Sequence, residues 1–382
     1  RSAFEADRLE VSTITSENGI ISDVVGGGSL GASLSFRDGL LSDTRNELGR
    51  IASALASTLN QQNAAGLDLY GERGAAIFAQ PTPTAIAASN NNGGAAITAS
   101  LSDVSALTGR NIAMRFDGSN WQFNDAGSGQ ALNNWTGSGT AADPFVIDGV
   151  SIALSGPVAA GDRFMVKPTE AAAASLSVVM SDPGQLASAA ATRSGANAAN
   201  TGTASISETQ VVDANHPNLI DAISISFIDA STYSINGAGS FSYAPGETIS
   251  INGNNVSITG TPAAGDVFTI GKNTGASGDN RNMLAMADVE TLQVLNGGSA
   301  SVQDAVSGLV GDIAVATRSA ELNRDAQQNL LNQARATVES ISGVNLDEEA
   351  SNLLKFQQAY QAAAQAASVA NQLFQSLIGA IS

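Results

Sequence analysis

The stretch LDEEASNLLKFQQAYQAAAQAASVANQLFQSLIGAIS, residues 346–382, decides how this chain is organised. Its apolar residues recur at helical spacing, which predicts one helix from Leu346 to the end of the chain. Acidic residues occupy the first turn, where the helix dipole favours negative charge, and no charged residue follows Lys355. Apolar and small residues form two seams with alternating steps of three and four. A surface helix needs one apolar stripe, so two stripes on an uncharged helix indicate that several faces are covered.

This terminal helix admits two interpretations. It could be an ordinary buried helix of a monomer, or an assembly helix that docks on copies of itself or on a partner. We favour assembly because a separate segment at a chain end would otherwise fray. Its apolar surface also predicts that the free helix is loose or bound by a chaperone. The predicted assembly and chaperone interface consists of its large apolar side chains, which are Leu346, Leu353, Phe356, Tyr360, Leu373, Phe374, Leu377 and Ile378.

Three further segments have helical spacing. FRDGLLSDTRNELGRIASALASTLNQQ, residues 36–62, predicts an amphipathic helix of about 25 residues. Residues 302–341 predict a long helix that ends at the Ser-Gly pair which follows. Residues 282–295 predict a short apolar helix. Residues 11–25 favour short strands, and the three glycines of residues 26–28 then break the chain.

The middle of the chain, from about residue 75 to 275, has strand signals. Dipeptides such as Asp148-Gly149 and Asn252-Gly253 are typical of hairpin turns, and short alternating apolar runs flank them. An internal repeat is present, since IDGVSIALSGPVAAGDRFMV (147–166) aligns without gaps on INGNNVSITGTPAAGDVFTI (251–270). The order turn, strand, loop, strand is predicted for both copies. An Ala/Ser-rich stretch with some helical character, roughly 171–204, separates two related β modules.

These signals together predict an α+β multidomain fold, with a long helical bundle or coiled-coil core and inserted antiparallel β modules. We expect residues 1–78 and 276–341 to form a discontinuous, mainly helical core domain. Residues 79–275 would form an outer β region, with modules at about 79–180 and 205–275. Residues 342–382 would form the C-terminal assembly helix.

Composition excludes several classes of site and partner. The 382 residues include no cysteine and one histidine, His216, so disulfides, thiolate chemistry and a two-histidine zinc site are excluded. The formal net charge is −18 and the 17 basic residues are dispersed, which argues against nucleic-acid binding. No apolar run reaches the about 18 residues of a membrane span, so no membrane insertion is expected. We expect no cofactor and no metal.

Candidate catalytic features have simpler structural explanations, and we predict that the chain is not an enzyme. The glycine-rich stretch 26–31 has no lysine and no phosphate-loop spacing. The acids at 347–349 are explained by the helix dipole. Asp162 and Asp266, which recur in the repeat, could bind a cation, but aspartates that hydrogen-bond their own turns are the better interpretation.

A resemblance to a known family then becomes clear. Residues 342–378 closely resemble the C-terminal segment of flagellar axial proteins. Further segments resemble the hook-associated protein 1 family of the hook–filament junction, in the family's order: 26–71, 162–183, 278–293 and 317–334. Together they cover roughly half of the chain. The chain begins at Arg1 rather than Met and lacks the N-terminal helices of the family, so we expect a missing N-terminal part.

The resemblance implies a structural role in the extracellular bacterial flagellum. Family members have a coiled-coil domain built from both chain ends, a helical second domain and outer β domains. They are exported through the flagellar type III system, and their C-terminal helix binds an export chaperone. They form a ring of about eleven subunits between the hook protein and a second junction protein on the filament side. By position, residues 346–381 would be the inner-tube and chaperone-binding segment, and 36–62 with 302–341 the helical second domain.

Two alternatives stay open at the level of sequence. A secreted β-rich adhesin or glycan-binding protein would fit the Asn/Thr/Gly-rich modules, with Trp121 and Trp135 available to stack on sugars. Another axial protein, of the hook or rod, would share the terminal segment, but the 26–71 block argues against it.

Overall fold

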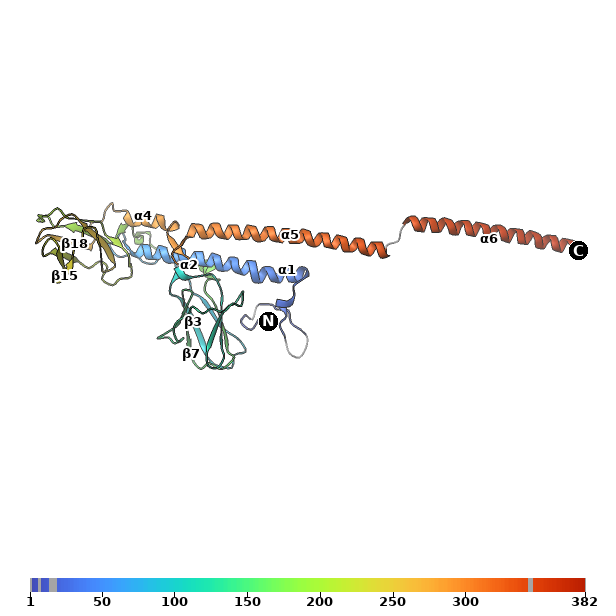
Figure 1. Cartoon of the computed structure of the whole chain (residues 1–382), viewed down its shortest axis with the longest axis horizontal. Helices are drawn as coiled ribbons and strands as arrows, with labels where there is room; N and C mark the ends of the chain where they lie inside the picture. Colours follow the sequence, from blue (N-terminus) through green and yellow to red (C-terminus); the bar gives the residue numbers. More distant parts are fainter. Residues whose placement is uncertain (1, 6–7, 14–18, 343–345, 382) are drawn as a thin grey trace. The chain divides into compact units, whose positions relative to one another are not determined.

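The computed structural model describes residues 2–5, 8–13, 19–342 and 346–381, without the side chains of 23, 341–342, 346 and 380–381. The chain divides into two compact units, Arg1–Ile313 and Ala314–Ser382. Helix α5 (Val302–Ser342) begins in the first unit and continues into the second, which also holds α6 (Leu346–Ile381). Figure 1 colours these elements along the chain. The long helices predicted at 302–341 and from Leu346 onward are therefore confirmed.

A continuous helical stretch organises the first unit. It consists of α1 (Gly28–Phe36), one π-turn η2 (Arg37–Leu41) and α2 (Ser42–Ala64), so the helix predicted at 36–62 is confirmed and begins earlier than expected. Ile51 and Ala54 of α2 pack against Val302, Ala305 and Leu309 of α5 in one buried cluster. In this cluster the apolar faces of α2 and of the beginning of α5 cover each other.

Short helices and hairpins connect these parts. They are η1 (Ser22–Val24), η3 (Val104–Ala106), α3 (Ala172–Ser175), η4 (Pro183–Gln185), α4 (Arg281–Ala287) and η5 (Asp288–Glu290), with the two-stranded pairs β1 (Gly66–Leu67) with β9 (Ala189–Ala190) and β19 (Gln293–Leu295) with β20 (Ala300–Ser301). Leu67, Ala189, Ala191 and Leu219 form a small buried cluster that joins this region to the strands after residue 191.

Two local predictions were wrong. The helix expected at 282–295 ends at Glu290, and Gln293–Leu295 forms a strand instead, because Asn296, Gly297 and Gly298 take positive φ and reverse the chain into a hairpin. The described residues of this range, 11–13 and 19–25, form one isolated bridge, Ser12 with Ile20, and the turn η1 rather than the expected strands, and residues 14–18 lie outside the described part. The helical character expected in the Ala/Ser-rich stretch 171–204 is confirmed in α3 and in the turn η4, and short extended segments make up the rest.

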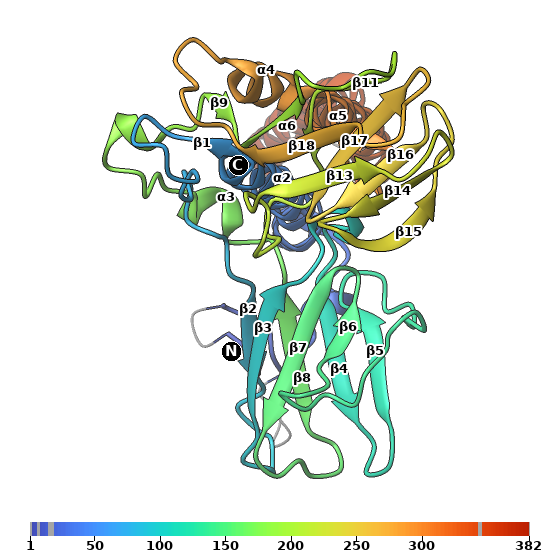
Figure 2. The ribbon, with the colours of Figure 1, turned by 90° about the vertical axis from the view of Figure 1, so that its left-hand side faces the viewer.

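The first β module is a two-layer antiparallel sandwich. One sheet has the order β2-β8-β4-β5 and the other β3-β7-β6, as Figure 2 shows. Between them lies an apolar core that includes Ile112, Met114, Phe145, Ile152 and Phe164. The strands are β2 (Thr84–Ala87), β3 (Ala96–Leu101), β4 (Ile112–Phe116), β5 (Trp121–Asp125), β6 (Phe145–Ile147), β7 (Val150–Ser155) and β8 (Arg163–Lys167).

The second β module repeats this topology. Its sheets have the orders β10-β18-β13-β14-β15 and β11-β17-β12, with β16 also paired to β17. Strand β18 takes the place of β8, β17 that of β7 and β16 that of β6, so β15 is an added edge strand. The strands are β10 (Thr192–Ala196), β11 (Ser205–Ile206), β12 (Gln210–Val211), β13 (Ile223–Phe227), β14 (Thr232–Ile235), β15 (Ala238–Ser242), β16 (Thr248–Ile251), β17 (Asn254–Thr259) and β18 (Val267–Lys272).

Turn chemistry explains why the repeat folds alike. Asp148 and Asn252 occupy the same left-handed turn position, with φ of 48° and 46°, and each is followed by a glycine with positive φ. Asn, Asp and Gly tolerate this conformation, so both hairpins can form type I′ turns. The predicted order of turn, strand, loop and strand is confirmed in both copies. An α+β chain with several antiparallel sheets is likewise confirmed.

The first sandwich attaches to α2 at its base. The Thr169 hydroxyl donates to the carbonyl of Asn46 over 2.8 Å. Gly49 lies against the backbone of Thr169 so closely that a Cβ on Gly49 would stand 1.7 Å from the Thr169 carbonyl oxygen. A glycine is therefore required at this crossing for steric reasons.

Candidate assembly surface

The C-terminal helix α6 carries the candidate surface. Its first turn holds Asp347, Glu348 and Glu349, which complement the positive end of the helix dipole. Lys355 is the last charged residue, and Ala, Gln, Leu and other good helix formers dominate the remainder. At 1.5 Å per residue the helix is about 54 Å long. The local sequence therefore specifies a long helix whose larger part bears no charge.

The predicted interface side chains on α6 are exposed in this chain. Their exposed fractions range from 53% for Ile378 to 77% for Tyr360, and Leu353, Phe356, Leu373, Phe374 and Leu377 fall between these values. Leu346 opens the helix, and its side chain lies outside the described part of the structure. Single exposed apolar residues are ordinary, whereas a continuous row of this kind marks an interaction surface.

The spacing of the largest side chains is that of a helix–helix seam. Leu353, Phe356, Tyr360, Phe374 and Leu377 fall on one run with alternating steps of three and four residues, and the places between Tyr360 and Phe374 are filled by alanines. This repeat averages 3.5 residues per turn, which keeps the seam turned toward a partner helix. Alanines in the middle permit close approach of the two backbones. The surface is thus shaped for another helix.

Helix α5 also bears exposed apolar residues in the second unit. Val315, Leu322, Leu330, Leu331 and Val338 are each 45% to 72% exposed. Polar pairs such as Arg318 with Glu321, at 3.3 Å, lie on the same helix. Unlike α6, α5 therefore alternates apolar and charged surface along its length.

Other parts of the described structure supply no convincing catalytic centre. Among the described residues, no group of three or more His, Asp or Glu side chains is placed to hold a metal ion. A hollow of about 790 Å³ near Tyr70 and Gly184 includes Lys272 and Asp279 in its lining. The hydrogen bond from Arg281 lowers the pKa of Asp279 to about 2, so this carboxylate is a weak proton acceptor. None of the helices searched in the described chain is both long and apolar enough to cross a membrane.

The aspartates that recur in the repeat hold loops. Asp162 accepts hydrogen bonds from the backbone N–H groups of Ala159, Asn92 and Gly93. Asp266 accepts the same set from Ala263, Thr201 and Gly202. The turn interpretation is confirmed, and each carboxylate also fastens a second loop that is distant in sequence.

The tryptophans considered for sugar stacking belong to the first sandwich. Trp121 packs edge-on against Phe145 at 5.7 Å between ring centroids, and Trp135 packs against Phe123 at 4.9 Å. Both rings join the apolar core cluster of that module. Both rings are partly buried against aromatic neighbours, which weakens a glycan-binding interpretation.

Comparison with protein families finds matches to flagellar proteins in three ranges of the chain. Residues 2–78 match the helical domain of the flagellar hook-associated protein FlgK, and residues 86–168 match the D2-like domain of flagellar hook-associated protein 1. Residues 337–380 match the C-terminal region of the flagellar basal body rod FlgEFG proteins. The flagellar hook junction protein FlgK from Burkholderia pseudomallei has a similar structure, with 27% identity and a TM-score of 0.77 over 89% of this chain and 69% of that one.

Over most of its length the chain is similar to flagellar hook-associated protein 1.

Curated members of the hook-associated protein 1 family extend the match. The protein of this name from Escherichia coli (strain K12) is 28% identical over 92% of this chain, and the one from Salmonella typhimurium is 27% identical over 92%. The alignments cover 49% of each relative, so the chain spans about half the length of these curated relatives. The resemblance recognised in the sequence is confirmed by these matches.

Proposed function

We propose that this chain is a structural component of the bacterial flagellum that self-assembles at the hook–filament junction and connects the hook to the filament. The observation that carries the proposal is α6, where a row of exposed apolar side chains occupies a helix that is uncharged after Lys355. The apolar faces of such a helix are unfavourably exposed to water until another helix covers them. Similarity to hook-associated protein 1 supports the junction as the place of assembly.

The proposed interface comprises the α6 side chains named from the sequence, from Leu346 to Ile378. In the assembled state, α6 packs in a helical bundle or coiled coil, as its seam spacing favours. We assign residues 1–78 and 276–341 to a helical core domain, 79–275 to outer β modules, and 342–382 to assembly. Copies of the chain close into a ring of about eleven subunits between hook protein and a second junction protein.

Before assembly the same helix is covered by another protein. We propose that a flagellar type III export chaperone binds α6, since its exposed apolar row would otherwise favour aggregation. The chain is exported by the type III system and acts outside the cell, on the flagellum, without catalytic activity. The formal net charge of −18 would keep free copies apart in solution until α6 meets its partner.

The two rival functions have less support. An adhesin that binds sugars through Trp121 and Trp135 is disfavoured because both rings pack into the first sandwich. A hook or rod protein would account for the match at 337–380, but the matches at 2–78 and 86–168 are to hook-associated proteins.

Electron microscopy of purified hooks stripped of their distal caps tests the junction assignment. The unmodified chain should add a short collar at the hook tip. The variant Phe356→Gln/Phe374→Gln/Leu377→Gln places three polar groups on the seam and should reduce the fraction of hooks with collars at least tenfold, because those groups would be buried without partners. Circular dichroism should show unchanged β content, since the substitutions lie outside both sandwiches.

A matched control alters α6 away from the seam. Gln361→Ala/Gln375→Ala changes exposed polar positions of the same helix and should leave collar formation intact. If the unmodified chain forms no collars, or if the seam variant forms as many as the control, the proposal is wrong. Binding of the β modules to glycans in place of hooks would favour the adhesin.

A further inference from the structure

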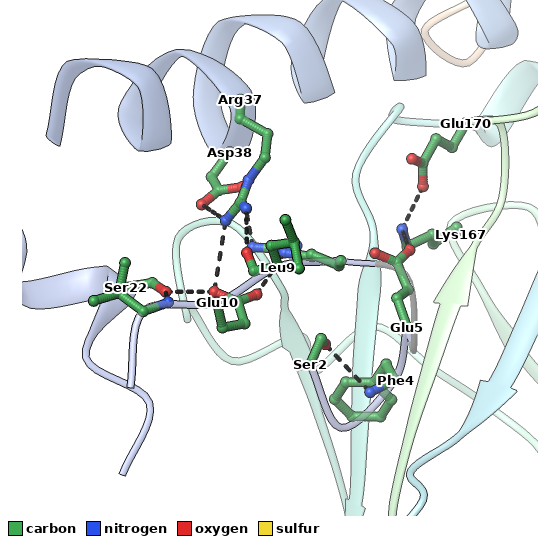
Figure 3. Close-up of polar contacts among 12 residues, drawn as sticks. Ser2, Phe4, Glu5, Leu9, Glu10, Ser22, Arg37, Asp38, Lys167 and Glu170 are labelled. Atoms are coloured by element: carbon green, nitrogen blue, oxygen red, sulfur yellow. Dashed lines mark hydrogen bonds and ion pairs between the residues drawn. The ribbon is translucent and has the colours of Figure 1, made fainter. Parts of the chain in front are cut away.

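The segment before α1 lies along the first sandwich as an N-terminal strap, defined here as residues 2–5, 8–13 and 19–25. Figure 3 shows its polar contacts. The carbonyl of Ala3 accepts a hydrogen bond of 2.8 Å from the backbone N–H of Ser89, just after β2. The carboxylate of Glu5 pairs with the ammonium of Lys167 at the end of β8. The strap is therefore fastened to one sheet of the sandwich.

The charges around Lys167 continue to the helix. Lys167 also lies 2.7 Å from Glu170, and Glu170 lies 3.7 Å from Arg45 of α2. The Lys167 side chain is 13% exposed and that of Glu170 is 19% exposed. A row of alternating charges thus joins the strap, the sandwich and the helix.

A second set of contacts fastens the strap to the π-turn η2. The Glu10 carboxylate lies 2.7 Å from Arg8 and 3.6 Å from Arg37, and its side chain is 6% exposed. Arg37 donates to the carbonyl of Leu9 over 2.7 Å, and Arg8 lies 3.0 Å from Asp38. The guanidinium of Arg37 lowers the pKa of Asp38, so Asp38 stays charged at neutral pH. Ser22 donates to Glu10 from the far end of the strap.

These contacts supplement the attachment at the base of the sandwich, where η3 and the segment that includes α3 lie against α2. There the Thr169 hydroxyl meets Asn46, and the backbone N–H of Gly297 donates to Ser105 over 2.8 Å. An attachment through a few loop residues resists translation better than rotation. The strap also contacts the first sandwich at β8 and the helix at η2. Contacts at these two points oppose rotation of the sandwich on the helix.

We propose that the N-terminal strap is an electrostatic clasp that holds the first sandwich in one orientation on the α1–α2 helix. Glu5 and Glu10 are its two fastening points, and the attachment at Thr169 is the pivot. Glu5 fastens the strap to the sandwich and Glu10 fastens it to the helix, so the strap links the two bodies away from the pivot. Release of the clasp leaves the sandwich folded and connected but free to turn about the pivot.

Solvent reaches the clasp from within. A cavity of about 730 Å³ is bordered by the strap, by Arg37 and Arg45 of the helix and by Met165 of the sandwich. The more exposed partners, Arg8 at 36%, Arg37 at 31% and Glu5 at 31%, are screened by salt, with a Debye length of about 8 Å at physiological ionic strength and about 3 Å at 1 M. The less exposed side chains of Glu10 and Lys167 are screened less. The clasp should accordingly loosen at high salt, whereas the apolar cores of the sandwiches should not.

The second sandwich provides an internal comparison. The residue that aligns with Lys167 in the repeat is Gly271, which lies on β18, the strand equivalent to β8. A glycine offers no charge for a strap carboxylate. The cation that receives Glu5 is thus an addition to the first sandwich, beyond what the shared fold needs.

Spin-label distance measurement on the full chain tests the clasp. The chain has no cysteine, so Ala32→Cys on α1 and Ser100→Cys on β3 take labels at those sites alone. At low salt we expect one narrow distance distribution. Glu5→Gln/Glu10→Gln should widen it at least twofold, and 1 M NaCl should widen that of the unsubstituted labelled chain.

The control Glu72→Gln/Glu290→Gln removes the same number of charges from exposed positions and should keep the distribution narrow. Fluorescence of Trp121 and Trp135 reports on the folding of the first sandwich and should be the same in all variants. If the clasp variant keeps the narrow distribution at low salt, or if 1 M NaCl leaves the labelled chain unaffected, the proposal is overturned.

Discussion

At the scale of single residues, the architecture depends on a few positions where backbones touch. Gly49 is one of these, because α2 crosses the loop of Thr169 without room for a side chain. The helix pattern of residues 36–62 could be predicted from apolar spacing, yet nothing in that spacing shows that Gly49 is a crossing point. The partner that makes the glycine necessary lies far along the chain, and such contacts are set by tertiary packing.

Substitution of Gly49 by alanine should therefore destabilise the first unit. The new methyl group would force Thr169 away from the helix, at a cost of about 1–3 kcal/mol in the free energy of unfolding. Denaturant titration followed by tryptophan fluorescence and by circular dichroism measures this. Gly311→Ala is the control, since nothing lies within 4 Å of that site on α5. Alanine there should be neutral or stabilising by up to about 1 kcal/mol, and equal effects at both sites would refute the packing argument.

At the scale of elements, the two sandwiches show how far local chemistry can be extrapolated. The repeat, its turns and its antiparallel strands could be predicted because Asp-Gly and Asn-Gly pairs act through their own backbone. The same reasoning failed at residues 282–295, where helical periodicity continued into a strand that the following Asn-Gly-Gly turn enforces. Mixed charges in the N-terminal strap gave no hint of the Glu5–Lys167 pair, since its members are 162 positions apart.

The aspartate clamp of each sandwich should act independently. Asp162→Asn replaces an acceptor by an amide whose N–H groups face the backbone donors of Ala159, Asn92 and Gly93, so the first sandwich should melt at a lower temperature. Asp266→Asn should leave that transition unchanged and lower the stability of the second sandwich. Tryptophan fluorescence separates the two, because Trp121 and Trp135 both lie in the first module. A shift of the tryptophan transition by Asp266→Asn would contradict independent clamps.

The clamp also predicts a pH dependence. The hydrogen bond from the Ala159 N–H, followed by those from Gly93 and Asn92, lowers the pKa of Asp162 below its ordinary value. The stabilisation is therefore complete above the aspartate pKa of the unfolded chain, about 3.9. It is lost as the pH falls through the lower pKa of the folded state. The difference in melting temperature between Asp162→Asn and the unmodified chain should shrink over that acidic range.

At the scale of the whole molecule, the chain combines β modules whose apolar cores are buried with helices whose apolar side chains are exposed. Each sandwich covers its own apolar core, whereas α6 and the second-unit part of α5 leave large apolar side chains exposed. The row on α6 was predictable from spacing and the lack of charge. The partner that covers this row could not be predicted, because the residue spacing of one chain carries no information about the surface of another protein. Our proposal of a flagellar partner rests on the similarity to hook-associated protein 1.

Hydrogen exchange of α6 in the free chain and in the chain bound to purified hooks tests the central claim most directly. If α6 is the assembly segment, its amides from about residue 350 to 378 should exchange quickly in the free chain, as exposed helices with few packed contacts do. They should slow at least a hundredfold on hooks, while amides of β4 and β17 change little. Slow exchange already in the free chain, or fast exchange that persists on hooks, would contradict the account.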